Sequence, residues 1–278
     1  MTFKSNHTFN YPSHTWRQIE KWYQSEIGQE IFQSEVPVVE ELLDQCFGYN
    51  LVLMGAKVNA RVLDKSRIKQ KCCINPLADQ LSQPVSSILY VSSLFEMLSL
   101  KSGSIDAIVL FHCLEFSPDP HAILREAERV LVAEGKLIIA GFNPFSLFGL
   151  WRYSLRIKAK YQNYVPIIPS KTPLISTAKI QDWLSLLGFS YQDKESIFFR
   201  PPINNHSLLL KIQFMEKTGK RFWPFLSSAY VMMAVKRVST LTPIKNKWRL
   251  KKKLVGEVVS ETSVTNLNSI SNKDNNER

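Results

Sequence analysis

Apolar and polar positions follow two different periods in the centre of the chain. Residues 105–110 are apolar except for Asp106, which is typical of a strand buried on both faces of a parallel sheet. Residues 121–131 repeat apolar positions at helical spacing, and residues 136–141 form a second apolar strand. Gly135 stands where a left-handed residue would end the helix. This order of strand, helix and strand predicts an α/β fold with a right-handed crossover.

The same patterns predict elements on both sides of this unit. We expect Asp119 to cap the central helix and Pro120 to open its first turn. We expect further strands at residues 50–55, 71–74, 88–92, 189–199 and 229–238, and helices at residues 16–32, 38–46, 177–187 and 207–219. The expected domain organisation is a disordered N-terminus (1–14), a helical cap (15–47), a main domain (48–243) with an insert (142–175), and a basic, polar, disordered tail (244–278).

Short motifs within residues 104–142 occur in a fixed order. They are Ile105-Asp106, His112-Cys113-Leu114-Glu115, Asp119-Pro120, residues 124–131 and residues 135–139. In this order they resemble the second half of class I S-adenosylmethionine (SAM)-dependent methyltransferases of the small-molecule kind, the methyltransferase type 11 group. The resemblance implies a Rossmann-like seven-stranded sheet in the order 3-2-1-4-5-7-6, with strand 7 antiparallel and helices on both faces. It also implies SAM as the cofactor, and it makes residues 48–243 the methyltransferase-like domain.

The turn after the first expected strand departs from the family pattern. The family has an acidic residue and three glycines here, and the glycines let the backbone approach the methionine part of SAM. In this chain Leu53 stands at the position of the acid and Gly55 at that of the first glycine. Lys57 and Asn59 stand at the positions of the other two glycines. Gly55 is therefore the cofactor-binding residue that the resemblance implies for this turn.

The residue after the second expected strand is also altered. The family places an acid there to hold both ribose hydroxyls of SAM, and this chain has Asn75. An amide can bond a hydroxyl, but without the strength of a charge-assisted bond. Asp64 and Asp79 are alternatives for the same task.

The adenine end of the cofactor site maps onto residues near the third expected strand. The resemblance places Ser93, Leu94 and Phe95 beside the adenine ring, and Leu94 replaces an aspartate of the family. Phe95 could stack on the ring, and the backbone amides of this segment could contact it. Phe111 and His112, at the carboxyl end of the fourth expected strand, complete the expected cofactor site.

The candidate catalytic and substrate-binding residues follow the fourth and fifth expected strands. His112 is the candidate general base near neutral pH, and a structural role is the equal alternative. The resemblance makes residues 142–175 an insert that lies over the active site. Phe142, Phe145, Phe148 and Trp151 recur at every third residue, which predicts a shared helical face. The expected substrate-binding residues are Glu115, Phe142, Asn143, Phe145 and Trp151.

The altered cofactor positions keep more than one function open. The first is a SAM-dependent methyltransferase that acts on a small molecule. The second is a non-catalytic methyltransferase-like protein that has lost SAM binding and binds a partner. A third, less favoured by the sequence, is a methyltransferase that binds nucleic acid through its basic C-terminal region, because the fourth strand lacks the Asn/Asp-Pro-Pro-Tyr/Phe element common in base-directed enzymes.

Composition adds the charge and the expected location. The 278 residues carry a net charge of +11. Twelve of the cations lie between residues 211 and 253 against the single acid Glu216, a strip that could attract an anionic partner or simply be solvated. The four cysteines lack metal-ligand spacing, so we expect free or buried thiols and no metal site. The N-terminus is polar and no run reaches the roughly 18 apolar residues of a membrane span, so we expect a cytoplasmic protein.

Overall fold

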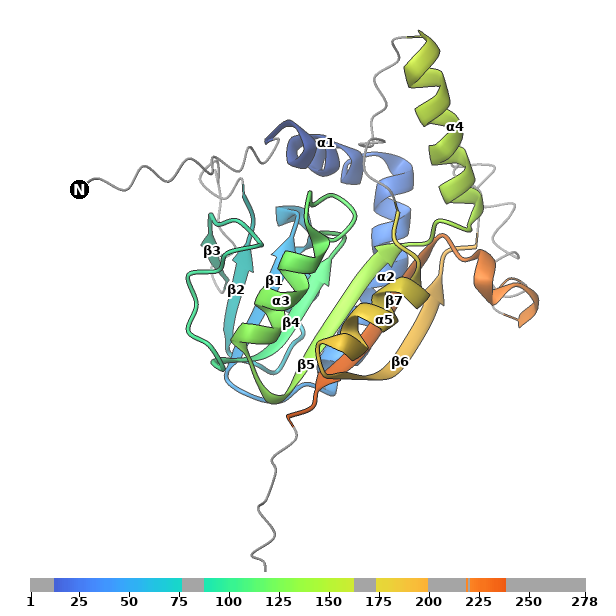
Figure 1. Ribbon diagram of the computed structural model, residues 1–278. Helices are drawn as coiled ribbons and strands as arrows, with labels where there is room; N and C mark the ends of the chain where they lie inside the picture. Colours follow the sequence, from blue (N-terminus) through green and yellow to red (C-terminus); the bar gives the residue numbers. More distant parts are fainter. Residues whose placement is uncertain (1–12, 77–87, 163–173, 200–218, 220, 239–278) are drawn as a thin grey trace, which may run out of the picture. The chain divides into compact units, whose positions relative to one another are not determined.

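The computed structural model describes residues 13–76, 88–162, 174–199, 219 and 221–238. The described strands are β1 (Asn50–Gly55), β2 (Gln70–Ile74), β3 (Leu89–Val91), β4 (Ile105–Phe111), β5 (Leu131–Phe142), β6 (Phe189–Ile197) and β7 (Ala229–Lys236). They form one sheet in the order β3-β2-β1-β4-β5-β7-β6, with β7 antiparallel to both of its neighbours (Figure 1). This confirms the predicted strand order and the reversed seventh strand.

Helices lie on both faces of this sheet. The described helices are α1 (Ser13–Tyr23), α2 (Glu26–Asp44), α3 (Pro120–Val130), α4 (Leu147–Gln162) and α5 (Thr177–Leu186), with 3-10 turns η1 (Lys57–Leu63) and η3 (Pro224–Leu226). Figure 1 shows α3 and α5 on one face and α2 on the other. The expected helix at residues 207–219 falls almost wholly outside the described residues, as do residues 1–12 and the expected tail at 244–278.

The β4–α3–β5 unit follows the predicted pattern closely. The Asp119 side chain accepts a hydrogen bond from the Ala122 backbone N–H at 3.0 Å, and Pro120 is the first helical residue. The predicted C-cap was wrong, because α3 ends at Val130 and β5 begins at the next residue. Gly135 lies inside β5, and the left-handed residue of this region is Glu134 with φ 62°. The chain thus passes from helix to strand without a glycine cap.

The N-terminal helices divide at a different residue from the one predicted. The pattern predicted a break before Pro37, yet α2 runs through Pro37 and the break falls between Tyr23 and Glu26. Ser25 explains this position, because its Oγ accepts the Gly28 N–H at 3.3 Å and so caps α2. A proline inside a helix removes one backbone bond, a loss that the packed face of α2 outweighs.

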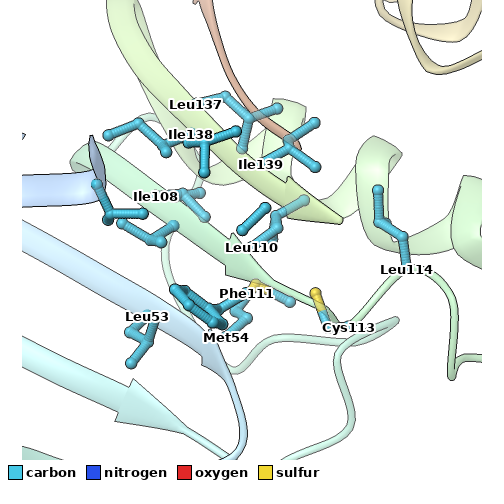
Figure 2. Packing of buried hydrophobic residues seen from close by; sticks show 14 of the residues in the cluster. Leu53, Met54, Ile108, Leu110, Phe111, Cys113, Leu114, Leu137, Ile138 and Ile139 are labelled. Carbon is cyan, nitrogen blue, oxygen red and sulfur yellow. The ribbon is translucent and has the colours of Figure 1, made fainter. Parts of the chain in front are cut away.

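The core is centred on the middle strands. Figure 2 shows Leu53 and Met54 of β1 packed with residues of β4 and β5, such as Ile108 and Ile138. Residues 107–111 of β4 are fully buried on both faces, as the apolar run predicted. The outer β1-side strands are shorter, and β3 has only three residues.

Candidate functional site

The carboxyl ends of β1 and β4 mark the point where the strand order reverses. In open α/β sheets, ligands bind outside the carboxyl ends of the strands at such a point. Helix α1 lies across this edge of the sheet (Figure 1). The Trp16 ring centroid lies 5.1 Å from that of Phe95, and the Tyr23 centroid lies 6.2 Å from that of His112. Helix α1 therefore forms one wall of the candidate site.

The turn after β1 is built for close strand packing. Gly55 is the last residue of β1 and pairs with Phe111 of β4. A Cβ atom at Gly55 would lie 2.7 Å from the Phe111 backbone oxygen, so only glycine fits without a shift. The chain then passes through Ala56 directly into η1. Leu53, at the position of the family's acid, is fully buried in the core.

Asn75 follows β2 directly and is buried at the same edge of the sheet. Its Nδ2 donates a hydrogen bond to Oε1 of Glu20 in α1, over 3.1 Å. Of the two alternative acids, Asp64 accepts a bond from Lys71 near the amino end of β2, through its backbone oxygen. Asp79 lies outside the described residues. The hydrogen bond of Asn75 thus places the Glu20 carboxylate at the end of β2.

The segment expected at the adenine position packs under α1. Ser93 and Leu94 are half-buried, and the Ser93 hydroxyl donates to the Met97 backbone oxygen at 3.2 Å. Phe95 is fully buried and meets Trp16 edge to face, with an angle of 84° between the rings. Phe95 therefore contributes to the packing of α1 on the sheet.

A buried Glu-His-Glu cluster, made of Glu35, His112 and Glu115, lies at the carboxyl end of β4. Nε2 of His112 is 2.8 Å from Oε1 of Glu35, and its Nδ1 is 3.6 Å from Oε1 of Glu115. The same Glu115 oxygen accepts the Phe142 backbone N–H at 2.6 Å. All three side chains are at most 1% exposed. The cluster thus ties α2 to the ends of β4 and β5.

The electrostatics of the cluster make His112 a cation at neutral pH. Burial by itself lowers the His112 pKa, but Glu35 and Glu115 outweigh burial and raise the pKa from 6.5 to about 9. Burial raises the pKa of Glu35, and His112 lowers it in part. His112 also has a left-handed backbone with φ 51°, a conformation that costs a non-glycine residue about 1–2 kcal/mol. A general base must be unprotonated and within reach of its substrate, so this geometry favours the structural alternative for His112.

Two of the expected substrate residues, Phe142 and Asn143, occupy different environments. Phe142 is the buried end of β5 and stacks on His112 with ring centroids 4.1 Å apart. Asn143 shapes the following turn, because its Nδ2 donates to the backbone oxygen of Ser227 at 3.0 Å and its Oδ1 accepts the Phe145 N–H at 3.1 Å.

The predicted aromatic face of the insert was only partly correct. Phe148 and Trp151 do share a face of α4, with ring centroids 5.8 Å apart. Phe145 precedes the helix and is 72% exposed, and Phe142 belongs to the strand. The three-residue spacing failed because the helix begins only at Leu147.

The sequence patterns did not single out Glu20 or Glu35. Glu35 lies in line with the buried residues Ile27, Ile31 and Val39 of α2, at a spacing of four residues. An acid inside such an apolar stripe is the signal that could have identified it. Glu20 likewise follows the buried Trp16 by four residues.

A groove elsewhere on the sheet is separate from this site. It has a volume of about 580 Å³ and follows the amino-terminal halves of the strands, at residues such as Asn50, Gln70 and Leu89. Among the residues that the structure describes, no cluster of His, Cys, Asp and Glu side chains could hold a metal ion. The cysteines are free thiols. None of the described helices combines the length and the apolar character that crossing a membrane requires.

Comparison with known sequences adds a family match. Residues 54–139 match the model of a methyltransferase domain family. The uncharacterized protein YafS of Escherichia coli (strain K12) is 34% identical over 154 residues, which are 53% of this chain and 56% of that relative. The chain therefore spans little more than half the length of this curated relative.

Solved structures share the fold. A SAM-dependent methyltransferase from Thermotoga maritima superposes with a TM-score of 0.56 at 19% identity, over 80% of this chain and 100% of that one. The magnesium protoporphyrin IX methyltransferase of Synechocystis PCC 6803, solved with bound SAH, gives 0.54 at 12% identity, over 82% and 96%. Likeness at such identities shows the fold alone. With the family match, it confirms the resemblance to class I SAM-dependent methyltransferases inferred from residues 104–142.

Proposed function

We propose that this chain, which carries a class I methyltransferase domain, transfers a methyl group from SAM to a small molecule. The observation that carries the proposal is the β4–α3–β5 unit. It matches the family in sequence within residues 54–139, and it lies in a sheet with the family's strand order. The acceptor molecule and a cytoplasmic location stay predictions.

The side chains at the end of β2 fit the sugar part of SAM. A ribose presents two neighbouring hydroxyl groups, and hydroxyls are bound by amide and carboxylate side chains. Asn75 and Glu20 supply these two groups within hydrogen-bond distance of each other at the expected edge. The turn at Gly55 fits less well, because the space left by its missing side chain is used by Phe111. The donor set therefore supports binding through the sugar more than through a glycine-rich turn.

Aromatic rings gather around the end of β5. When bound, SAM would supply a methyl group on a positively charged sulfur. The Phe142, Phe148 and Trp22 rings lie together, with Phe142 4.8 Å from Phe148 and 5.5 Å from Trp22 between centroids. These rings are buried in the core, and beside a bound SAM they would help to exclude water from a reaction that needs proximity and in-line alignment of the two reactants.

We assign His112 a positioning role in this proposal. It is paired with Glu35, and its pKa of about 9 keeps it protonated at neutral pH. Its left-handed backbone turns the chain out of β4 at the expected cofactor edge. Methyl transfer to an acceptor that is already nucleophilic needs no general base, so the absence of a free base at His112 is compatible with catalysis. Glu115, Asn143, Phe145 and Trp151 stay substrate-binding predictions.

The second candidate is a non-catalytic methyltransferase-like binding protein. It is favoured by the turn after β1, where Leu53 is a core residue and Ala56 leads straight into η1. Each lost polar anchor costs on the order of 1–3 kcal/mol. Losing two anchors could move a micromolar site toward millimolar affinity.

Calorimetric titration with SAM and with its demethylated product SAH distinguishes the two candidates. We expect measurable but weak binding of both. Transfer of labelled methyl groups from SAM into a mixture of small molecules would then identify the acceptor. If neither SAM nor SAH gives a heat of binding at millimolar concentration, the methyltransferase proposal is wrong and the non-catalytic binding protein is favoured.

A further inference from the structure

Helix α1 presents three residues of one helical face to the carboxyl edge of the sheet. Trp16, Glu20 and Tyr23 stand at positions i, i+4 and i+7, which share one face of a helix. Trp16 packs on Phe95 after β3, and Tyr23 lies near His112 after β4. Glu20 lies between these two anchors, so its carboxylate is held over the sheet edge from both sides.

The partner of Glu20 fixes its place more closely. Asn75 is the first residue after β2 and is 1% exposed. Its amide nitrogen donates to Oε1 of Glu20 at 3.1 Å, across 55 residues of sequence. The carboxylate therefore stands directly at the end of β2, next to the point where the strand order reverses between β1 and β4.

We propose that Glu20 binds the ribose hydroxyl groups of SAM, so that helix α1 supplies the carboxylate that the end of β2 lacks. This inference rests on the proposed function. The site would then be composite, with Asn75 from the sheet orienting a carboxylate from the helical cap. Glu20 would be a binding residue rather than a catalytic one, because the sugar takes no part in the transfer.

The chemistry of the two side chains supports this assignment. A carboxylate has about four lone-pair sites, so it can accept hydroxyl hydrogens while it accepts the Asn75 amide. Bonds from a hydroxyl to an ionised carboxylate are roughly twice as strong as bonds between neutral groups. Asp64 does not compete, because the bond from Lys71 places it near the amino end of β2.

The test is calorimetric binding of SAH to the full chain and to the Glu20→Gln variant. Glutamine keeps the shape of the side chain and an acceptor for Asn75, but it removes the charge. We expect SAH affinity to fall about tenfold or more, as for the loss of a charge-assisted bond. Glu41→Gln is the matched control, since Glu41 is an exposed acid of α2, and it should bind SAH like the wild type.

Analogues of SAH that lack the 2′- or the 3′-hydroxyl separate binding from a merely structural role. The wild type should bind at least one analogue about tenfold more weakly than SAH, and this loss should shrink to about threefold or less in Glu20→Gln. If Glu20 only anchors α1, the variant would lower the melting temperature and weaken all three ligands equally. That result, or unchanged SAH affinity, overturns the Glu20 assignment alone. A wild type that binds no SAH at millimolar concentration overturns the proposed function as well.

Discussion

The two sides of the sheet differ in the polar interactions that stabilise their carboxyl ends. On the β4–α3–β5 side, a capped helix leads into a strand paired with its neighbour, and a buried Glu-His-Glu cluster closes the carboxyl end. On the β1–β2–β3 side, β3 is three residues long and a 3-10 turn follows β1. At this second edge, Asn75 donates its side-chain amide to Glu20 of α1 and its backbone N–H to Val91 of β3.

This difference indicates that the carboxyl end of β4 is the more rigid of the two edges. Burying ionisable side chains requires that they be paired, and His112 lies within ion-pair distance of both Glu35 and Glu115, between α2, β4 and β5. The β1–β3 edge depends on α1 for its cover instead. A ligand that enters between α1 and the sheet would therefore meet a fixed β4 end and an adaptable β2 end.

The largest effect is expected from His112→Ala. This change leaves Glu35 and Glu115 buried without their cationic partner, which should lower the free energy of unfolding by about 3–5 kcal/mol. Urea unfolding followed by circular dichroism measures it. His121→Ala, at an exposed histidine of α3 that contacts the Trp183 ring but has no buried acid beside it, is the control and should cost about 1 kcal/mol.

A second substitution sharpens this result. Adding Glu35→Gln to His112→Ala removes one of the uncompensated charges, so part of the lost stability should return. A loss below about 1 kcal/mol in His112→Ala would contradict an ion-paired cluster, and the two sides of the sheet would then be equally adaptable.

The fold was more predictable than the site because the two depend on different information. Apolar runs such as residues 105–110 fix the strands locally, and the strand order followed from the resemblance. The pairs that build the site join residues far apart in the sequence: Glu35 and His112 are separated by 77 positions, and Glu20 and Asn75 by 55. No periodicity reports such a pair. The break at Ser25 was missed for a similar reason, since packing of α2 overrode the helix-breaking tendency of Pro37.

The effect of pH on stability should be nearly as large as the effect of His112→Ala. The folded His112 pKa of about 9 exceeds its unfolded value of 6.5. Its contribution is therefore present in full below pH 6.5 and lost as the pH rises through 9. A shift of this size corresponds to about 3 kcal/mol. Glu35, whose pKa is raised by burial, acts in the same direction.

Urea titrations between pH 6.5 and 9 measure this loss, and the slope should largely vanish in His112→Gln. Above pH 9 other groups join in, because burial raises the pKa of Cys46 and of Cys72 to about 11. Stability that does not change with pH across the window would mean that His112 is neutral in the folded protein.

Gly55→Ala should cost about 1–3 kcal/mol, the usual range for overpacking. The added Cβ would stand 2.7 Å from the Phe111 backbone oxygen, which cannot move without shifting β4. Gly103→Ala meets nothing within 4 Å and pays only for its left-handed backbone, about 1 kcal/mol. If Gly55→Ala is as stable as the wild type, the turn after β1 has more room than the packing indicates, and a direct contact with the cofactor becomes more plausible there.

The smallest effects are expected at two helix caps, one on each face of the sheet. Asp119 caps α3 with a 3.0 Å bond to the Ala122 N–H, and Ser25 caps α2 with a 3.3 Å bond to the Gly28 N–H. Asp119→Ala should cost about 1 kcal/mol and lower the melting temperature by about 2–4 °C. The cap bond of Ser25 is longer, but Ser25→Ala also removes the 2.6 Å bond from its Oγ to the Trp22 backbone oxygen, so we expect a cost of similar size.

Asp119→Asn tests whether the cap or the charge stabilises α3. Asparagine caps a helix about as well as aspartate, and the ion pair of Asp119 with Arg125 is exposed and 3.7 Å long, so its loss should matter little. A melting temperature near that of the wild type is therefore expected in scanning calorimetry. If Ser25→Ala proves the more damaging of the two alanine variants, the junction of α1 and α2 stabilises the protein more than the α3 cap does. The helical cover of the β2 edge would then be as rigid as the β4 side, and a ligand could not enter by displacing α1.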